Sequence, residues 1–140
     1  MTNYYHAAVM HMLNEQREEL IPRVARNLVA RIPIIGVPPS SEDRELIHHH
    51  QMALTARRFH DLVQAGATID WSLVSSEFGW ADRKLRPMGI THEHHRALIA
   101  AYFIEARLLH PWTPNELAAL EEIAALLRQA VEAGYQMHDA

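Results

Sequence analysis

Apolar residues recur along this chain at helical spacing, and prolines, glycines and capping residues divide them into separate helices. One apolar face predicts a helix over Tyr4–Glu19, and a second runs from Pro22 to about Arg31. Pro33–Ser41 contains three prolines and a glycine, so we expect a connector there. No stretch alternates apolar and polar residues with the period of two that marks a half-buried strand.

The second half of the chain continues the helical pattern. The helices expected there are Glu42–Gly66, Trp71–Phe78, Trp80–Arg86, His92–Leu109 after a Thr91 cap, and a last helix from Thr113 to Gly134. Gly66 and Gly79 are expected to end their helices, because glycine favours the position after a helix end. Thr113-Pro114-Asn115-Glu116 is a capping box with proline at the first helical position. We expect the tail Tyr135–Ala140 to be loose.

Together these elements predict one all-α domain of six to eight helices over residues 1–140. Its N-terminal helices occupy 1–32, and its core occupies 42–134. The chain has 140 residues, of which 49% are hydrophobic, and this is enough to bury a core without cross-links. It has no cysteine, which excludes disulfides, thiolate metal sites and thioether-linked cofactors.

Charge and hydropathy narrow the classes of partner. The net charge of -4 argues against nucleic acid as the main partner. No apolar run approaches the roughly 20 residues that span a bilayer. The first residues lack the basic segment and apolar core of a signal peptide. We therefore expect a cytoplasmic protein that binds neither nucleic acid nor membrane.

Histidine is the unusual component, with 11 residues, and three of them are adjacent in the longest predicted helix. Because His48, His49 and His50 spread around a helix, at least one must lean toward the interior. The triplet is either a solvated face with one satisfied member or the wall of a ligand pocket. His92–His95 lacks the zinc-protease spacing and is interpreted as a solvated helix start. Glu45-x-x-His48 matches half of a di-iron motif, but no second pair accompanies it.

The order of a long helix, two short helices that carry tryptophans and two long closing helices resembles the globin pattern. Within it, residues 56–102 look like the core of phycobiliproteins. The shared features are a helix ending in Ala65-Gly66 and a leucine-rich stretch that runs into the corner Met88-Gly89-Ile90-Thr91. The segment also resembles the small globins found beside bilin-biosynthesis genes. The resemblance covers Glu42 to about Arg107 and implies a globin-like fold that holds a tetrapyrrole.

The resemblance also implies how a ligand would be held. Phycobiliproteins attach an open-chain tetrapyrrole between helices E and F through a cysteine on helix E. Counted back from Ala65-Gly66, the place of that cysteine falls at or near His48, so a bilin would bind here without a thioether bond. An ordinary haem globin needs a histidine on helix F, and none lies between Thr68 and Gly89. A bilin is therefore the leading candidate ligand, followed by haem or cobalamin.

The residues that could hold a tetrapyrrole are cations for its propionates, rings that pack against it, and histidines that bond its oxygens. They are Arg57, Arg58, Arg83 and Lys84; Phe59, Trp71 and Trp80; and His48, His49, His50 and His60. Each has an alternative, since aromatic residues also build cores and arginines also form solvated faces. No catalytic residue and no metal-ligand set is predicted.

These observations lead to a functional hypothesis: a non-enzymatic tetrapyrrole-binding globin that carries or senses a bilin. The resemblance implies a homodimer, and the apolar helix Tyr4–Leu13 favours pairing through the N-terminal helices. One alternative is a cofactor-free globin-like interaction or signalling module whose histidine-rich helix responds to pH. A histidine metal site is a further alternative.

Overall fold

A computed structural model describes residues 2–38, 40 and 42–137, and over these residues it contains helices and connecting segments but no strand. The helices are α1 (Thr2–Glu15), α2 (Arg17–Arg31), α3 (Arg44–Thr68), α4 (Ser72–Leu85), the short 3₁₀ helix η1 (Arg86–Met88), α5 (His92–Leu109) and α6 (Pro114–Met137). The prediction of an all-α chain is confirmed. No helix in the described part of the chain is long and apolar enough to cross a membrane.

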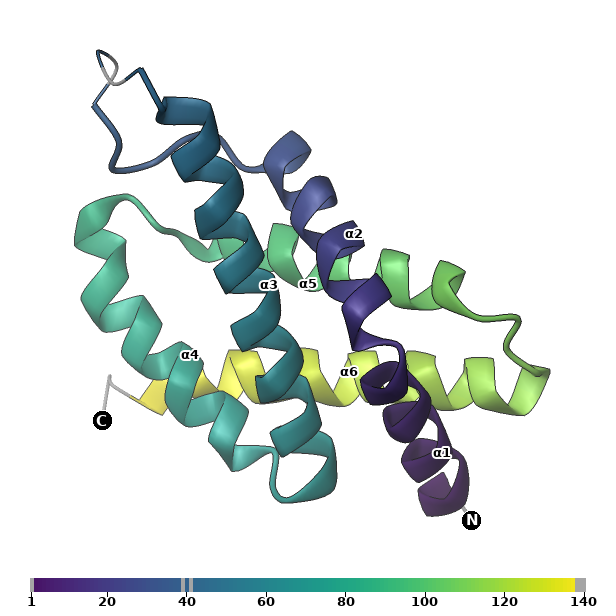
Figure 1. Ribbon diagram of the computed structural model, residues 1–140. Coiled ribbons are helices and arrows are strands. Elements are labelled where there is room, and N and C mark those ends of the chain that lie inside the picture. The colour runs from purple at the N-terminus through teal and green to yellow at the C-terminus, as the bar shows by residue number, and fades with distance from the viewer. Residues whose placement is uncertain (1, 39, 41, 138–140) are drawn as a thin grey trace.

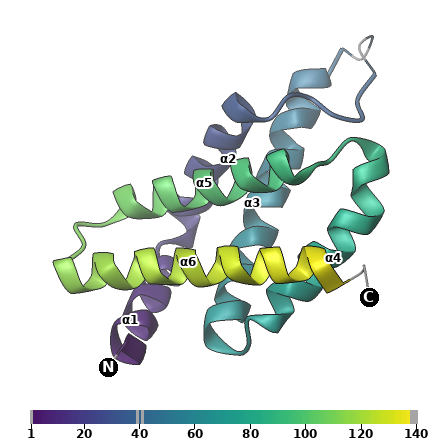
Figure 2. The same ribbon diagram turned by 180° about the vertical axis from the view of Figure 1, so that it is seen from behind.

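Helices α2 and α3 pack on each other, and they cross the pair formed by α5 and α6 (Figure 1). Helix α3 lies across the front of the molecule, with α5 and α6 behind it (Figure 1). Seen from behind, α5 and α6 run side by side (Figure 2). Helix α2 packs on both α3 and α5, while α1 and α4 pack on α6. Each α-helix contributes fully buried side chains, among them Leu13, Leu20, Val63, Val74, Tyr102 and Leu127.

Local capping chemistry sets the starts of the last two helices. At α6 the Thr113 backbone N–H donates to the Glu116 carboxylate at 2.9 Å, and the Glu116 N–H donates to the Thr113 hydroxyl at 3.2 Å. The predicted capping box is therefore confirmed. At α5 the backbone N–H of Thr91 donates to His94 Nδ1 at 2.9 Å, so Thr91 caps the helix as expected.

Two helix boundaries differ from the sequence prediction because of tertiary packing. Gly66 does not end α3, since it is buried against Trp71, and a Cβ there would lie 2.6 Å from Trp71 Cε3. Gly79 does not end a helix either, because α4 runs through it as one helix. A Cβ on Gly79 would lie 2.7 Å from the carbonyl oxygen of Gly134, so the glycines allow α4 and α6 to cross closely.

The two ends of the chain also differ from expectation. The first helix ends at Glu15, four residues before the predicted end, and Pro22 lies inside α2. At the other end α6 continues to Met137, and Tyr135 is buried, so the prediction of a loose tail is wrong for residues 135–137. Residues 138–140 of that predicted tail lie outside the described residues.

Helix α1 has its partners within the chain. Val9 and Leu13 have no exposed surface, and α1 packs on α6 and α3. The sequence suggested that this apolar face lacked a partner and favoured pairing between two chains through it. That argument is wrong, because the face is already covered by the chain's own helices.

Candidate functional site

The residues expected to hold a tetrapyrrole come from α3, α4 and the turn between them. On α3, Phe59 and His60 point into the core, whereas Arg57 and Arg58 are exposed. The histidine triplet is also divided, because His48 is buried while His49 and His50 are exposed. One helix thus directs its candidate residues to several different sides.

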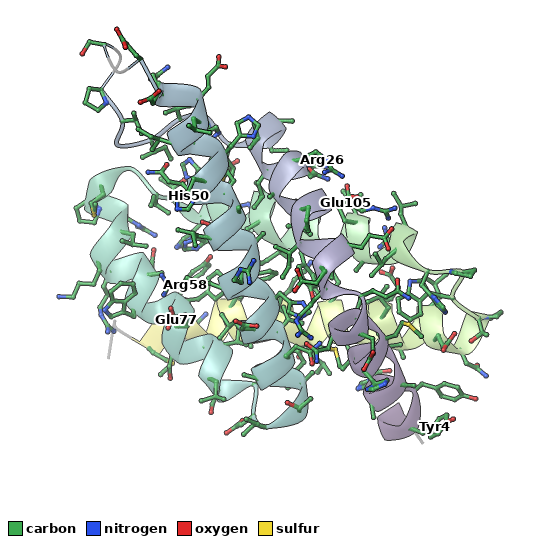
Figure 3. All side chains as sticks on the ribbon, in the orientation of Figure 1. Tyr4, Arg26, His50, Arg58, Glu77 and Glu105 are labelled. Atoms are coloured by element: carbon green, nitrogen blue, oxygen red, sulfur yellow. The ribbon has the colours of Figure 1, made fainter. Side chains whose placement is uncertain are left out.

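The candidates on α4 are mostly at the surface. Arg83 and Lys84 are exposed in its last turn, and Trp80 keeps 44% of its surface exposed. Trp71, just before α4, is the exception, because it packs on Gly66 of α3. Arg58 on α3 and Glu77 on α4 lie on facing sides of the two helices (Figure 3). The Arg58 guanidinium is 3.4 Å from the Glu77 carboxylate.

Aromatic rings close the contact between α3 and α4. Phe59 and Phe78 meet edge to face, with ring centroids 6.2 Å apart and planes at 88°. Phe59 also meets Tyr102 of α5 at 5.2 Å, and Trp71 fills the surface of Gly66. Side chains of the chain itself therefore fill this contact between α3 and α4.

Two open depressions lie elsewhere on the surface, and neither is between α3 and α4. One, of about 360 Å³, is lined by α2 and α5 residues, namely Arg23, Arg26, Asn27, Ala30 and Glu105. The other, of about 350 Å³, lies where α2 ends and α3 begins, and it includes His48 and His49. Of the predicted site residues, only these two histidines line either depression.

His60 is a buried histidine whose ring nitrogens both have partners. Its Nδ1 lies 2.9 Å from the Tyr102 hydroxyl, and its Nε2 lies 3.4 Å from Asn14 Oδ1. Burial lowers the pKa of His60, so the ring is neutral, and burial raises the pKa of Tyr102, so its hydroxyl keeps its proton. Tyr102 then donates to Nδ1, and Nε2–H donates to Asn14. This network joins α1, α3 and α5.

A second polar cluster joins α4, η1, α5 and α6. Asp82 is 4% exposed, and its Oδ1 accepts from Arg86 Nη2 at 2.7 Å and from His92 Nε2 at 2.8 Å. Burial by itself would raise the pKa of Asp82, but the hydrogen bonds from His92 and Arg86 outweigh it, so the pKa is lowered. Arg86 Nη2 also lies 2.7 Å from His92 Nε2. His92 Nε2 donates to Asp82 when it carries a hydrogen, and it accepts from Arg86 when it does not.

The same cluster holds the end of α6. The His92 ring stacks on Tyr135 with centroids 3.7 Å apart, and His95 Nδ1 lies 2.6 Å from the Tyr135 hydroxyl. Burial, helped by the nearby His92, lowers the pKa of His95 to about 4, so this ring is neutral at physiological pH. The interpretation of His92–His95 as a solvated helix start is wrong for His95, which is 5% exposed.

The spacing of apolar residues in the sequence already indicated that His95 is buried, although its immediate neighbours are polar. His95, Ile99, Tyr102 and Ala106 follow one another at helical spacing and are all buried. Asp82 gave no such signal, because its hydrogen-bond partners Arg86 and His92 come from η1 and α5 rather than from its own helix. Among the described residues, no three His, Asp or Glu side chains gather as a metal site requires.

Comparison with known proteins adds no assignment. No protein-family model, no curated protein and no solved structure matches this chain. Arguments about function therefore rest on the chain's own residues.

Proposed function

We propose that this chain is a globin-like, non-enzymatic interaction or signalling module that works without a tetrapyrrole between α3 and α4. Support for the globin-like arrangement comes from the element order: a long α3, then α4 with η1, then long α5 and α6, parallel to globin helices E to H. The observation that supports the proposal is the edge-to-face contact of Phe59 and Phe78 between α3 and α4, where the resemblance to phycobiliproteins would place a pigment.

An absorbance titration of the purified protein with biliverdin, haemin and cobalamin tests this proposal. We expect no saturable change with any of the three. A sharpened, red-shifted bilin band or a Soret shift with haemin would overturn it and restore the tetrapyrrole hypothesis. Phe78→Ala is the matched control, because it opens the same space. Binding that appears only in this variant would show that the ring excludes the pigment.

The pH response of the module is assigned to His49 and His50, which are exposed on α3. Histidine gains a positive charge as the pH falls through the range of about 8 to 5, so acidification makes this surface more cationic. The resemblance to phycobiliproteins implies a second copy as the partner. If the surface takes part in that contact, the dimer weakens in acid, because like charges face one another.

Sedimentation equilibrium at about pH 5.5 and about pH 8 measures this response. We expect a dimer that is weaker at the lower pH, and we expect the difference to shrink when His49 and His50 are both replaced by glutamine. A monomer at both pH values would remove the homodimer from the proposal. A dimer whose affinity is the same at both pH values would show that His49 and His50 do not lie in its interface.

A further inference from the structure

The depression between the end of α2 and the start of α3 combines an apolar wall with polar groups from a single helix. Its volume is about 350 Å³, at the lower end of the range of ligand pockets, roughly 300–1,000 Å³. The wall comes from the end of α2 and the connector after it, and the polar groups come from the first turns of α3. The lining residues are Val29, Ile32, Pro33 and Ile34, with Glu45, His48 and His49 opposite.

His48 is the residue that makes this depression unusual. The side chain is 4% exposed, yet neither ring nitrogen has a hydrogen-bond partner among the described residues. Buried polar groups in proteins nearly always have partners, because leaving one unpaired costs free energy. A histidine ring carries at least one N–H donor in either protonation state. His48 therefore lines the depression with a buried ring that has no acceptor among the described residues.

Arg44 does not itself line the depression, but it precedes Glu45, which does, and it supplies a second unpaired donor. It lies one turn before His48, so both side chains project from the same face of α3. Its Nε is also buried without a partner. Two unpaired donors on one helix face, one of them on a guanidinium that keeps its positive charge, match an anionic acceptor such as a carboxylate.

We propose that this depression binds a small amphipathic acid, with its carboxylate on His48 and Arg44 and its apolar body against the wall of Val29, Ile32 and Ile34. A metal ion is a poorer occupant, because no three His, Asp or Glu side chains of the described residues gather as metal ligands. Glu45 lines the same depression and is exposed, and its charge opposes an acid. The proposal therefore predicts that neutralising Glu45 strengthens binding.

The position of the site gives binding a structural consequence. The acid would contact both α3 and the connector that leads into it, and so would hold the Pro33–Ile34 segment against the helix. The site lies apart from the α3–α4 contact, so it can be tested whatever the outcome of the tetrapyrrole titration.

Isothermal titration calorimetry with octanoate as the probe tests the proposal, with 1-octanol and acetate as comparators. We expect saturable, one-to-one binding of octanoate, and binding at least about tenfold weaker for octanol, which lacks the charge, and for acetate, which lacks the apolar body. His48→Leu and Arg44→Leu should each weaken octanoate binding by about tenfold or more, and Glu45→Gln should strengthen it. His50→Leu is the matched control, because it replaces an exposed histidine of the same helix and should change nothing.

Three calorimetric results would overturn the proposal. The first is the absence of saturable octanoate binding up to about 1 mM, which would mean that the depression holds only solvent. The second is octanol binding as tightly as octanoate, which would show that the carboxylate does not contribute to binding. The third is unchanged binding in His48→Leu. Histidine-ring NMR of the unmodified protein locates the probe without any substitution, so an unfolded variant cannot obscure the answer; an unmoved His48 signal on saturation also counts against the site.

Discussion

His48 and His60 lie on the same helix and are both buried, yet they differ in what surrounds them. His60 has no exposed surface, and its nitrogens meet Tyr102 of α5 and Asn14 of α1. His48 is 4% exposed, and its nitrogens meet no partner in the described chain. Burial of a histidine therefore does not by itself indicate whether the residue is structural or available to a ligand.

The difference arises from what α3 crosses at each point. Around His60, α3 meets helices that supply a hydroxyl and an amide oxygen, so the polar ring is satisfied within the fold. Around His48, it faces aliphatic side chains and Pro33, which has no backbone N–H to donate. In the C-terminal half of α3 the buried histidine has hydrogen-bond partners from other helices. In the N-terminal half the buried histidine has none among the described residues.

Of the substitutions considered, Phe59→Ala in the C-terminal half of α3 should lower the stability of the protein most. The ring is 3% exposed and contacts both Phe78 and Tyr102, so its removal leaves a cavity. We expect a loss of about 3–5 kcal/mol in the free energy of unfolding. Urea unfolding followed by circular dichroism measures it, with the exposed Leu54→Ala as control. A loss below about 1 kcal/mol would mean that the contact is loosely packed.

Replacing each histidine by leucine tests the comparison directly. His60→Leu leaves the Tyr102 hydroxyl buried without its partner, so we expect a loss of about 2–3 kcal/mol. His48→Leu removes an unpaired polar group, so we expect no loss and a gain of up to about 1 kcal/mol. Urea midpoints of the two variants, measured side by side, decide. Equal losses in both variants would contradict the difference between a partnered His60 and an unpartnered His48.

Acid should destabilise the protein through His95, which is a third buried histidine. Its pKa is about 4 in the folded chain and ordinarily 6.5, so the unfolded chain binds more protons between these values. Stability is therefore full above pH 6.5 and is lost as the pH falls toward 4. We expect His95 to account for about 2 kcal/mol of that loss, and burial lowers the pKa of His60 in the same direction.

Unfolding measured across this pH range, for the wild type and His95→Gln, checks the prediction. The variant should lose less stability on acidification, because glutamine cannot take up the proton. Parallel pH curves for the two proteins would show that His95 is not the group responsible.

Arg58→Ala should have the smallest effect of the series. The ion pair with Glu77 joins α3 to α4 at 3.4 Å, but its side chains are 77% and 46% exposed. We expect a change within about 0.5 kcal/mol, which is typical of exposed pairs. The urea midpoint measured in low and high salt is the readout, and a loss above about 1 kcal/mol would show that the two helices depend on this bridge.

Local signals predicted much of the fold. The capping box at Thr113 and the cap at Thr91 set helix starts through neighbouring atoms, and both were readable from the sequence. The roles of Gly66 and Gly79 were not, because each is decided by a helix or ring that arrives from elsewhere in the chain. Glycine inside a helix and glycine after one look alike until the partner is known.

The candidate site was less predictable than the fold. The sequence singled out the histidine triplet and required that one member lean inward, and the structure identifies that member as His48. The lack of partners for His48 could not be predicted, since it depends on which side chains of α2 and the connector face it. The buried positions of His95 and Asp82 likewise follow from how α4, α5 and α6 meet.

The crossing of α4 and α6 has a consequence for tracing the ancestry of this chain. Gly79 and Gly134 lie backbone to backbone, so neither position has room for a larger residue unless the helices move apart. A Cβ on Gly134 would lie 2.3 Å from the backbone oxygen of Ser75, so a second substitution adds a clash rather than relieving the first. Both positions are therefore held to glycine by backbone contact alone, whatever the neighbouring side chains are. We expect any relative of this chain that keeps the same crossing of α4 and α6 to keep a glycine at both positions, and an alignment of relatives would test this.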